Sequence, residues 1–249
     1  DDGNSTVRGH LRIFKTDDYD KFKMHPANRN IDPSHLNTLL KSIKRHNLLH
    51  ENPIKVKDED DGTYTILDGQ HRFASANILN TKIYYIITED MDISDVPSYQ
   101  TSKKWTYDDF LKHYCYYDLQ DYKIYAGYQK QSGWSHNCLM MLLAGHSKGV
   151  MTAFKNGSFK IIRSIEEAND KMNKVNSFSQ YFKHYKSRGF VTAMLRIINT
   201  VDEYKHDQMM QKMQYLSERL VKCTDTESYL RLLEKLYNYK TTGRYVRFI

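Results

Sequence analysis

Apolar and polar positions follow two different periods along the chain. In the first 90 residues, short stretches alternate with a period of two, which predicts strands. These stretches lie at 11–15, 53–57, 63–67 and 82–87. Apolar residues recur at helical spacing after Asp32 and Pro33, a pair typical of a helix start. A second helix is predicted from about Gln70 to Leu79, and this mixture of strands and helices predicts a small α/β or α+β unit.

From Thr106 onward, the apolar positions recur almost everywhere at helical spacing. Helices are predicted at about 107–117, 119–131, 135–144, from 164, and in three stretches within 189–239. The final stretch, 244–249, alternates again and predicts a terminal strand. The predicted fold class is therefore α+β, with an N-terminal domain at 1–92, a central helical domain at 93–160 and a helical C-terminal domain at 161–249.

The stretch YAGYQKQSGWSHNCLMMLLAG, residues 125–145, has the pattern of a helix-turn-helix. Gly133 would form the turn, and the second helix would begin near Ser135. The side chains that this helix would present to a DNA groove are Ser135, His136, Asn137 and Met141. Lys130 and Lys148 would hold phosphates on either side. An ordinary helical hairpin fits the same pattern and is the alternative.

The composition favours a polyanionic partner such as DNA. Lys and Arg total 37 against 30 Asp and Glu, which gives a formal net charge of +7 and a pI near 9. The three cysteines lie far apart, and no histidines have metal-ligand spacing, so we expect neither a disulfide framework nor a metal site. A cytoplasmic protein is the default for such cysteine usage. No apolar run approaches the roughly 20 residues that span a bilayer, so no membrane partner is expected.

The stretch YTILDGQHRFASANIL, residues 64–79, places a carboxylate, a glycine, an amide, an imidazole and a guanidinium at a strand-to-helix junction. They are Asp68, Gly69, Gln70, His71 and Arg72. A helix that opens after a glycine offers backbone N–H groups and the positive end of its dipole to an anion. The arginine adds a fork for phosphate, and the histidine adds another donor. The alternative is a plain turn with a solvated arginine.

At this point the sequence resembles the ParB/sulfiredoxin superfamily. The resemblance is carried by ILDGQHRFASA, by Asn28-Arg29, by Ser42-Ile43 and by the PIKV strand at 53–56, and it covers roughly residues 10–90. It implies a ParB/sulfiredoxin-like α/β fold that binds a nucleotide at this turn: CTP in ParB, ATP in sulfiredoxin and ADP in a related free-serine kinase. The residues that it implies at the phosphates are Arg29, Gly69, Gln70, His71 and Arg72. Mg²⁺ would accompany the nucleotide.

The chain departs from the ParB pattern Gly-Glu-Arg-Arg-x-Arg at three positions. Gln70 replaces the glutamate, His71 replaces the first arginine and Ala74 replaces the last. Fewer cations would therefore face a triphosphate, and a carboxylate that serves a metal or water is gone. Gln70 also stands where sulfiredoxin has its cysteine, which excludes disulfide chemistry at this site.

These features predict a ParB-like DNA-binding protein, in plasmid or phage partition or in transcriptional control, with nucleotide binding at the turn. An enzyme of the same fold, a nucleotide hydrolase or a small-molecule kinase, is the alternative, with Asp68 or His71 as base. A nuclease is a third interpretation, but clustered carboxylates for two metals are not seen. The Met and Tyr stripe at 209–220 predicts a packing face or a homodimer interface among the C-terminal helices.

Overall fold

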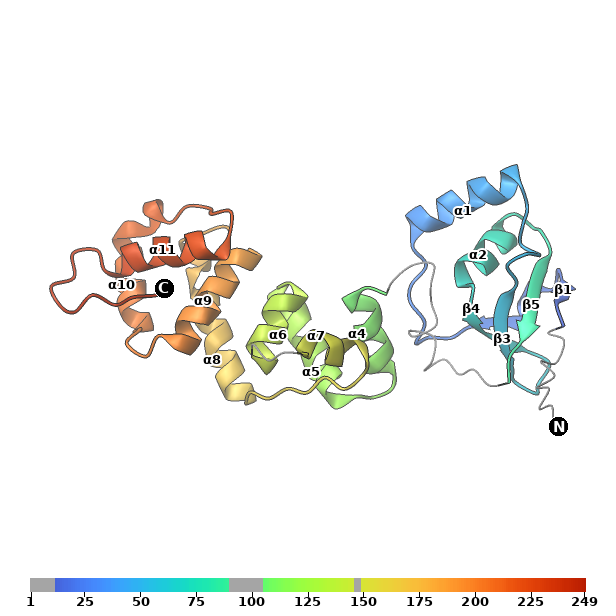
Figure 1. The fold of residues 1–249 in the computed structure, drawn as a ribbon, viewed down its shortest axis with the longest axis horizontal. Coiled ribbons are helices and arrows are strands. Elements are labelled where there is room, and N and C mark those ends of the chain that lie inside the picture. The colour runs from blue at the N-terminus through green and yellow to red at the C-terminus, as the bar shows by residue number, and fades with distance from the viewer. Residues whose placement is uncertain (1–11, 90–104, 146–148) are drawn as a thin grey trace, which may run out of the picture. The chain divides into compact units, whose positions relative to one another are not determined.

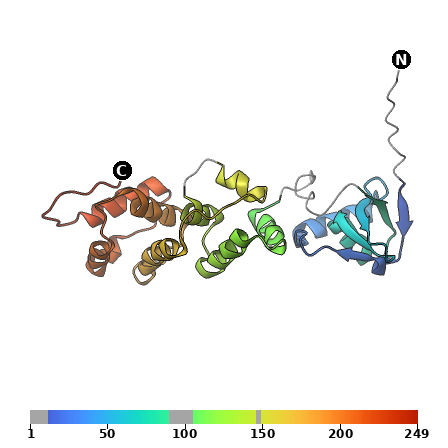
Figure 2. The same cartoon turned by 90° about the horizontal axis from the view of Figure 1, so that it is seen from below.

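The structure is a computed structural model of the chain, and it describes residues 12–89, 105–145 and 149–249. The chain divides into two compact units, Asp1–Tyr117 and Asp118–Ile249. The first unit combines a sheet with helices, whereas the described part of the second is built from helices (Figures 1 and 2). The predicted α+β fold class is confirmed.

The first unit is built on a mixed five-stranded sheet with the strand order β1-β5-β3-β4-β2. Its strands are β1 (Phe14–Thr16), β2 (Phe22–Met24), β3 (Ile54–Asp58), β4 (Tyr64–Asp68) and β5 (Ile83–Ile87). β3 and β4, both predicted as strands, form a hairpin, and its turn places Asp60 and Gly62 at φ of 56° and 83°. Val56, Ile66 and Ile83 are buried in the core of this unit. The short edge strand β2, parallel to β4, had no counterpart among the predicted strands.

Three helices and one 3-10 turn complete the described part of this unit. They are α1 (Pro33–Arg45), α2 (Gln70–Ile78), α4 (Tyr107–Tyr116) and the turn η1 (Tyr19–Lys21). Asp32 caps α1 as predicted, because its Oδ1 accepts the backbone N–H groups of Ser34 and His35 at 2.9 and 3.1 Å. α1 packs against α2, so the two helices lie together at the place where the candidate site forms.

α4 belongs to the first unit, although the predicted boundary at residue 92 placed it in the second domain. Its start is a capping box: Thr106 Oγ1 accepts the N–H of Asp109, and Asp109 Oδ2 accepts the N–H of Thr106. Farther along, Lys112 Nζ donates to the backbone carbonyl of Asn28 at 2.8 Å, and His113 Nδ1 lies 3.1 Å from the carbonyl of Ala27. These contacts, made across more than eighty residues, hold α4 against the segment before α1.

The second unit contains seven α-helices among its described residues. They are α5 (Gln120–Ser132), α6 (His136–Ala144), α7 (Val150–Lys155), α8 (Ile165–Asn176), α9 (Arg188–Thr200), α10 (His206–Leu216) and α11 (Thr226–Tyr237), with 3-10 turns η3 (Ser177–Gln180) and η4 (Ser217–Arg219). Met209 and Met213 are fully buried in this unit, so the methionine side of the 209–220 stripe is a packing face. The homodimer stays a prediction. Among the described helices, none is long and apolar enough to cross a bilayer.

The predicted terminal strand at 244–249 is wrong, because these residues form no strand. They are held instead by side chains of α11 and the residue after it. The backbone N–H of Phe248 donates to Glu234 at 2.6 Å, and that of Val246 donates to Asn238 Oδ1 at 2.9 Å. An alternating pattern therefore arose here from a segment that lies against a helix, with Phe248 buried.

Candidate functional site

The predicted strand-turn-helix is present at Asp68–Arg72. β4 ends at Asp68, and Gly69 adopts a left-handed φ of 96° as the N-cap of α2. A Cβ on residue 69 would lie 2.6 Å from Ile54 Cγ2, so a side chain does not fit there. The glycine thus brings the chain tightly around the end of β3, and the first N–H groups of α2, which lack intrahelical partners, are left for other acceptors.

Gln70 and His71 are only 3% and 4% exposed, and both hold the segment before α1. Gln70 Nε2 donates to the carbonyl of Arg29 at 2.8 Å, and the N–H of Asp32 donates to His71 Nε2 at 2.9 Å. His71 Nε2 is therefore an acceptor and cannot donate to a phosphate, which corrects the expected role of that nitrogen. A glutamate at 70 would place a carboxylate against a carbonyl, which explains physically why an amide suits this position.

Arg72 is tied to the protein more firmly than the sequence suggested. Its Nη1 donates to the carbonyls of Asn52 and Pro53, the latter at 2.9 Å, and its Nη2 donates to Asp68 Oδ2 at 3.0 Å. The alternative of a solvated arginine is wrong, because Arg72 joins α2 to β4 and to the loop before β3. Within the described residues, three of its five N–H donors are satisfied in this way, so two remain for a ligand.

Arg29 comes to the same place from a distant part of the chain. The neighbouring Asn28 donates from Nδ2 to the carbonyl of Leu67 at 3.3 Å, which fixes this segment at the end of β4. Arg29 itself is buried, and burial lowers the pKa of its guanidinium. Three carboxylates act in the opposite direction on this pKa, and they belong to Asp109, Asp68 and Asp32. A buried cation is thus held beside the turn, forty residues away in sequence.

These residues line one cavity of about 640 Å³ in the first unit. Its polar side is formed by Arg29, Asp68, Gly69, Gln70, His71, Arg72 and Lys55. Its apolar side is formed by Leu39, Ile43, Leu48, Leu49 and Ile86. Lys55 of β3 lies opposite Asp68 of β4 in the register of the sheet, so a further cation lies beside the turn. All five residues that the resemblance implied at the phosphates therefore line a single concave site.

The contribution of α1 and of the loop after it was not predicted from the sequence. His35, Ser42 and His46 also line the cavity, as do Glu51 and Asn52. His35, Leu39, Ser42 and His46 are spaced by four, three and four residues, which places them on one face of a helix. Polar residues on the otherwise apolar face of this helix were the available signal.

The predicted helix-turn-helix residues lie in the second unit. Gly133 is left-handed, with a φ of 67°, and ends α5 as the expected turn. Residues 138–144 of α6 are all buried, including Met141, so α6 cannot lie lengthwise in a DNA groove. The ring of His136 stacks on Tyr125, and its Nδ1 lies 2.9 Å from the Tyr125 hydroxyl. This side chain therefore already has a partner within the protein.

The remaining predicted DNA contacts are at the surface or outside the described residues. Ser135 is exposed, Asn137 is half-buried and Lys130 is exposed. Lys148 lies outside the described residues. DNA binding by a helix-turn-helix stays a prediction, and only the first turn of α6 is accessible for it.

Comparison with known proteins finds a family model that matches the first unit. No curated protein matches the chain. One solved structure that matches is the C-terminally truncated chromosome-partitioning protein ParB from Caulobacter crescentus complexed with CTP-γ-S, at 16% identity and a TM-score of 0.32, over 75% of this chain and 99% of that one. The sequence model of the ParB N-terminal domain matches residues 2–99, which include the whole cavity. The chain therefore carries a ParB-like N-terminal domain.

Proposed function

We propose that this chain is a cytoplasmic DNA-binding protein of the ParB type whose first unit binds a nucleoside phosphate at the Gly69–Arg72 turn. One observation carries the proposal. The fold brings Arg29 beside the turn on the wall of one cavity, at the start of α2. A buried guanidinium, a glycine without room for a side chain and a helix N-terminus together are what an anion site requires.

The cavity suits a nucleotide in size and in the arrangement of its walls. Its volume of about 640 Å³ lies in the range typical of small-molecule sites. The phosphates would lie against the N–H groups of α2, with Arg29, Arg72 and Lys55 around them. The sugar and base would lie against the apolar side formed by α1 and the loop after it. Mg²⁺ would enter with the phosphates, and Asp68 and Glu51 are the carboxylates on the cavity wall.

The geometry favours binding over catalysis. His71 Nε2 accepts from the backbone N–H of Asp32, which uses the lone pair of that nitrogen, and Asp68 Oδ2 accepts from Arg72, which occupies one of the two carboxylate oxygens. A general base needs a free lone pair within reach of its proton. The hydrolase and the kinase are therefore supported less well than a binding site whose occupancy acts as a switch.

DNA binding is assigned to the second unit by its charge. Residues 118–249 contain 21 Lys and Arg against 12 Asp and Glu, a net charge of +9. Residues 1–117 contain 16 against 18, a net charge of −2. The excess positive charge of the chain thus lies wholly in the helical unit. A nucleotide that favours one state of the first unit would act as a switch if the two states differ in DNA affinity.

Isothermal titration calorimetry with CTP, ATP and ADP, each with and without Mg²⁺, tests the proposal. We expect at least one of them to bind, and Arg29→Met to weaken binding by roughly ten- to more than a hundredfold, because a charge-assisted contact contributes about 1.5–3 kcal/mol. Met keeps the length of the side chain, and Lys41→Met on α1, outside the cavity, is the matched control. A wild-type protein that binds no nucleoside phosphate contradicts the proposal.

DNA binding is tested separately, by fluorescence anisotropy of a labelled duplex at several salt concentrations. We expect an affinity that falls steeply with salt and changes when the nucleotide is added. An affinity that is absent at low salt contradicts the assignment of the second unit.

A further inference from the structure

Two long stretches of the second unit contain no acidic residue. Residues 122–165 carry six Lys and Arg and no Asp or Glu, and residues 171–201 carry another six and again none. Any surface that these two stretches form together is necessarily basic. They are separated by the start of α8, which supplies Glu166, Glu167 and Asp170.

The fold packs the two acid-free stretches against each other. α5 packs on α6, and α6 packs on α9. Cys138 Sγ, in the first turn of α6, lies 3.8 Å from the carbonyl of Arg188 at the start of α9. Lys186 Nζ lies 3.8 Å from the position that a Cβ of residue 133 would occupy. The loop before α9 therefore lies at the turn between α5 and α6, although the two are fifty residues apart.

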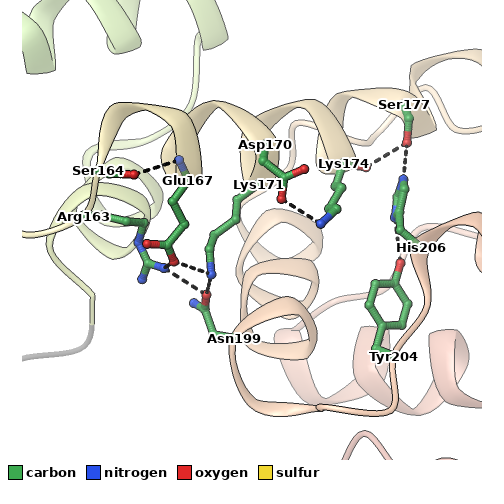
Figure 3. A network of polar contacts seen from close by, with 10 residues as sticks. All are labelled: Arg163, Ser164, Glu167, Asp170, Lys171, Lys174, Ser177, Asn199, Tyr204 and His206. Atoms are coloured by element: carbon green, nitrogen blue, oxygen red, sulfur yellow. Dashed lines mark hydrogen bonds and ion pairs between the residues drawn. The ribbon is translucent and has the colours of Figure 1, made fainter.

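Most cations around α8 are already paired, as Figure 3 shows. Glu167 accepts from Arg163 at 2.5 Å and from Lys171 at 3.0 Å, and both cations also reach Asn199. Lys174 pairs with Asp170 at 2.7 Å. The contacts of Arg163 and Lys171 with Asn199 join α8 and the segment before it to α9, whereas Lys174 pairs within α8, and in each case a carboxylate partly neutralises the cations.

The loop beside the α5–α6 turn differs from this network. Lys183, Lys186 and Arg188 are exposed, as is Lys130 in the last turn of α5. Within the described part of the chain, none of these four forms an ion pair with a carboxylate. Lys186 Nζ lies over the ring of Tyr185, 5.7 Å from its centroid. A group of exposed cations without carboxylate partners is suited to a regular array of negative charges and contributes little to the fold.

We propose that Lys183, Lys186 and Arg188, together with Lys130, form a surface that contacts the phosphate backbone of double-stranded DNA. The inference rests on the proposed DNA binding of the second unit and names the residues that hold the backbone. It also gives the accessible first turn of α6 a role. With backbone contacts from the neighbouring loop, Ser135 and Asn137 need only reach one or two base edges at this end of the helix.

The experiment compares two triple variants of the full chain. In the first, Lys183, Lys186 and Arg188 are each replaced by Ala. In the control, Lys222, Arg231 and Lys235 are replaced by Ala. These cations are also exposed and lie at or near α11, and their replacement removes the same charge. The probe is a labelled random-sequence duplex, followed by anisotropy over a range of salt concentrations. Each lost phosphate contact lowers the salt slope by about 0.9, so the first variant should lose roughly 2–3 units of slope and the control less than about one.

The outcomes separate this inference from the proposed function. A wild type that binds no DNA overturns both. A wild type that binds, with equal losses in the two variants, overturns the loop surface and leaves DNA binding in place. Polyglutamate that displaces the duplex from the wild type but not from the first variant would assign the surface to an acidic protein instead. Thermal melting checks the fold, and Lys186→Glu alone gives the same test if the triple variant is unstable.

Discussion

The two units have net charges of −2 and +9, yet phosphate groups are the proposed ligands of both. In the first unit, the candidate site depends on a few groups that the fold holds in place, with Arg29 buried beside the start of α2. In the second, it depends on many exposed cations that are not individually positioned. Net charge therefore indicates the second kind of site and says nothing about the first.

The two kinds of site should respond differently to salt. A buried cation such as Arg29, whose pKa is lowered by burial, is screened little by salt, whereas exposed cations are screened strongly. Nucleotide binding should therefore change little between low and high salt, and DNA binding should change greatly. Point changes should likewise have large effects in the first unit and small, additive effects in the second.

The largest expected effect follows from Gly69→Ala. Left-handed backbone disfavours Ala by about 1–2 kcal/mol and the contact with Ile54 adds about 1–3, so the first unit should lose about 2–5 kcal/mol of unfolding free energy, together with nucleotide binding. The matched control is Gly127→Ala in α5, where a Cβ meets nothing within 4 Å. Ala should stabilise that helix by about 0.5–1 kcal/mol.

Tryptophan fluorescence can follow each unit separately in urea. The chain has two tryptophans, buried Trp105 in the first unit and buried Trp134 in the second. A Trp134→Phe background then reports on the first unit, and a Trp105→Phe background reports on the second. A Gly69→Ala protein whose first unit unfolds at the parent's urea concentration would contradict the assigned turn.

The second-largest effect concerns Arg72. Arg72→Ala removes donors from Asn52, Pro53 and Asp68, and we expect a loss of about 1.5–3 kcal/mol of stability in the first unit as well as weaker nucleotide binding. Arg72→Lys should restore only part of both, because an ammonium cannot reproduce the planar fork. Melting and calorimetry of the two variants measure this. Unchanged melting in Arg72→Ala would mean that the observed contacts contribute nothing to stability.

The first unit could be predicted well because its signals are local. Asp32, Thr106 and Gly69 each fix an element boundary through neighbours in sequence, and Asp32 and Gly69 act as predicted. The features that were not predicted depend on contacts between residues far apart in the sequence. β2 exists because it pairs with β4, and α4 joins this unit because Lys112 and His113 reach the segment before α1.

The candidate sites were likewise predicted in part, and the part that was not predicted depends on distant contacts. Arg29 and the turn at 69–72 were predicted to share a pocket by resemblance, and the structure places them on one cavity wall. The roles of Arg72 and His71 could not be predicted, because their partners lie at Asn52, Pro53 and Asp32. In the second unit, the apolar pattern of α6 fits a hairpin and a DNA-reading helix equally, and only its packing on α9 shows how little of it is exposed.

Two changes at the α5–α6 turn should have intermediate effects on DNA binding. Asn137→Ala should weaken binding to a specific sequence by about 1–3 kcal/mol if this side chain reads a base. Lys130→Ala should weaken all sequences alike and lower the salt slope by about one. Anisotropy with specific and random duplexes distinguishes them. An equal loss on both duplexes for Asn137→Ala would show that it contacts no base.

The smallest expected effect is the loss of stability at acid pH, in which the two units should behave alike. Burial lowers the pKa of His113 in the first unit, and His25 lowers it further. Burial also lowers the pKa of His206 in the second unit, where Lys174 lowers it further and Asp207 and Asp170 raise it. His206 lies between Ser177 and Tyr204, at 3.0 and 2.9 Å (Figure 3). Both rings therefore remain neutral in the folded protein at pH values where the unfolded chain already takes up a proton.

The sign of the pH dependence follows from these lowered pKa values. The stability contribution is complete above the ordinary histidine pKa of about 6.5 and is lost as the pH falls below it, toward the folded pKa. Urea unfolding at about pH 7.5 and about pH 5 should show both units weakened by acid. His113→Gln should reduce the acid effect in the first unit alone, and His206→Gln in the second alone. If either variant reduced the effect in both units, the two would unfold as one, and the comparison between them would lose its basis.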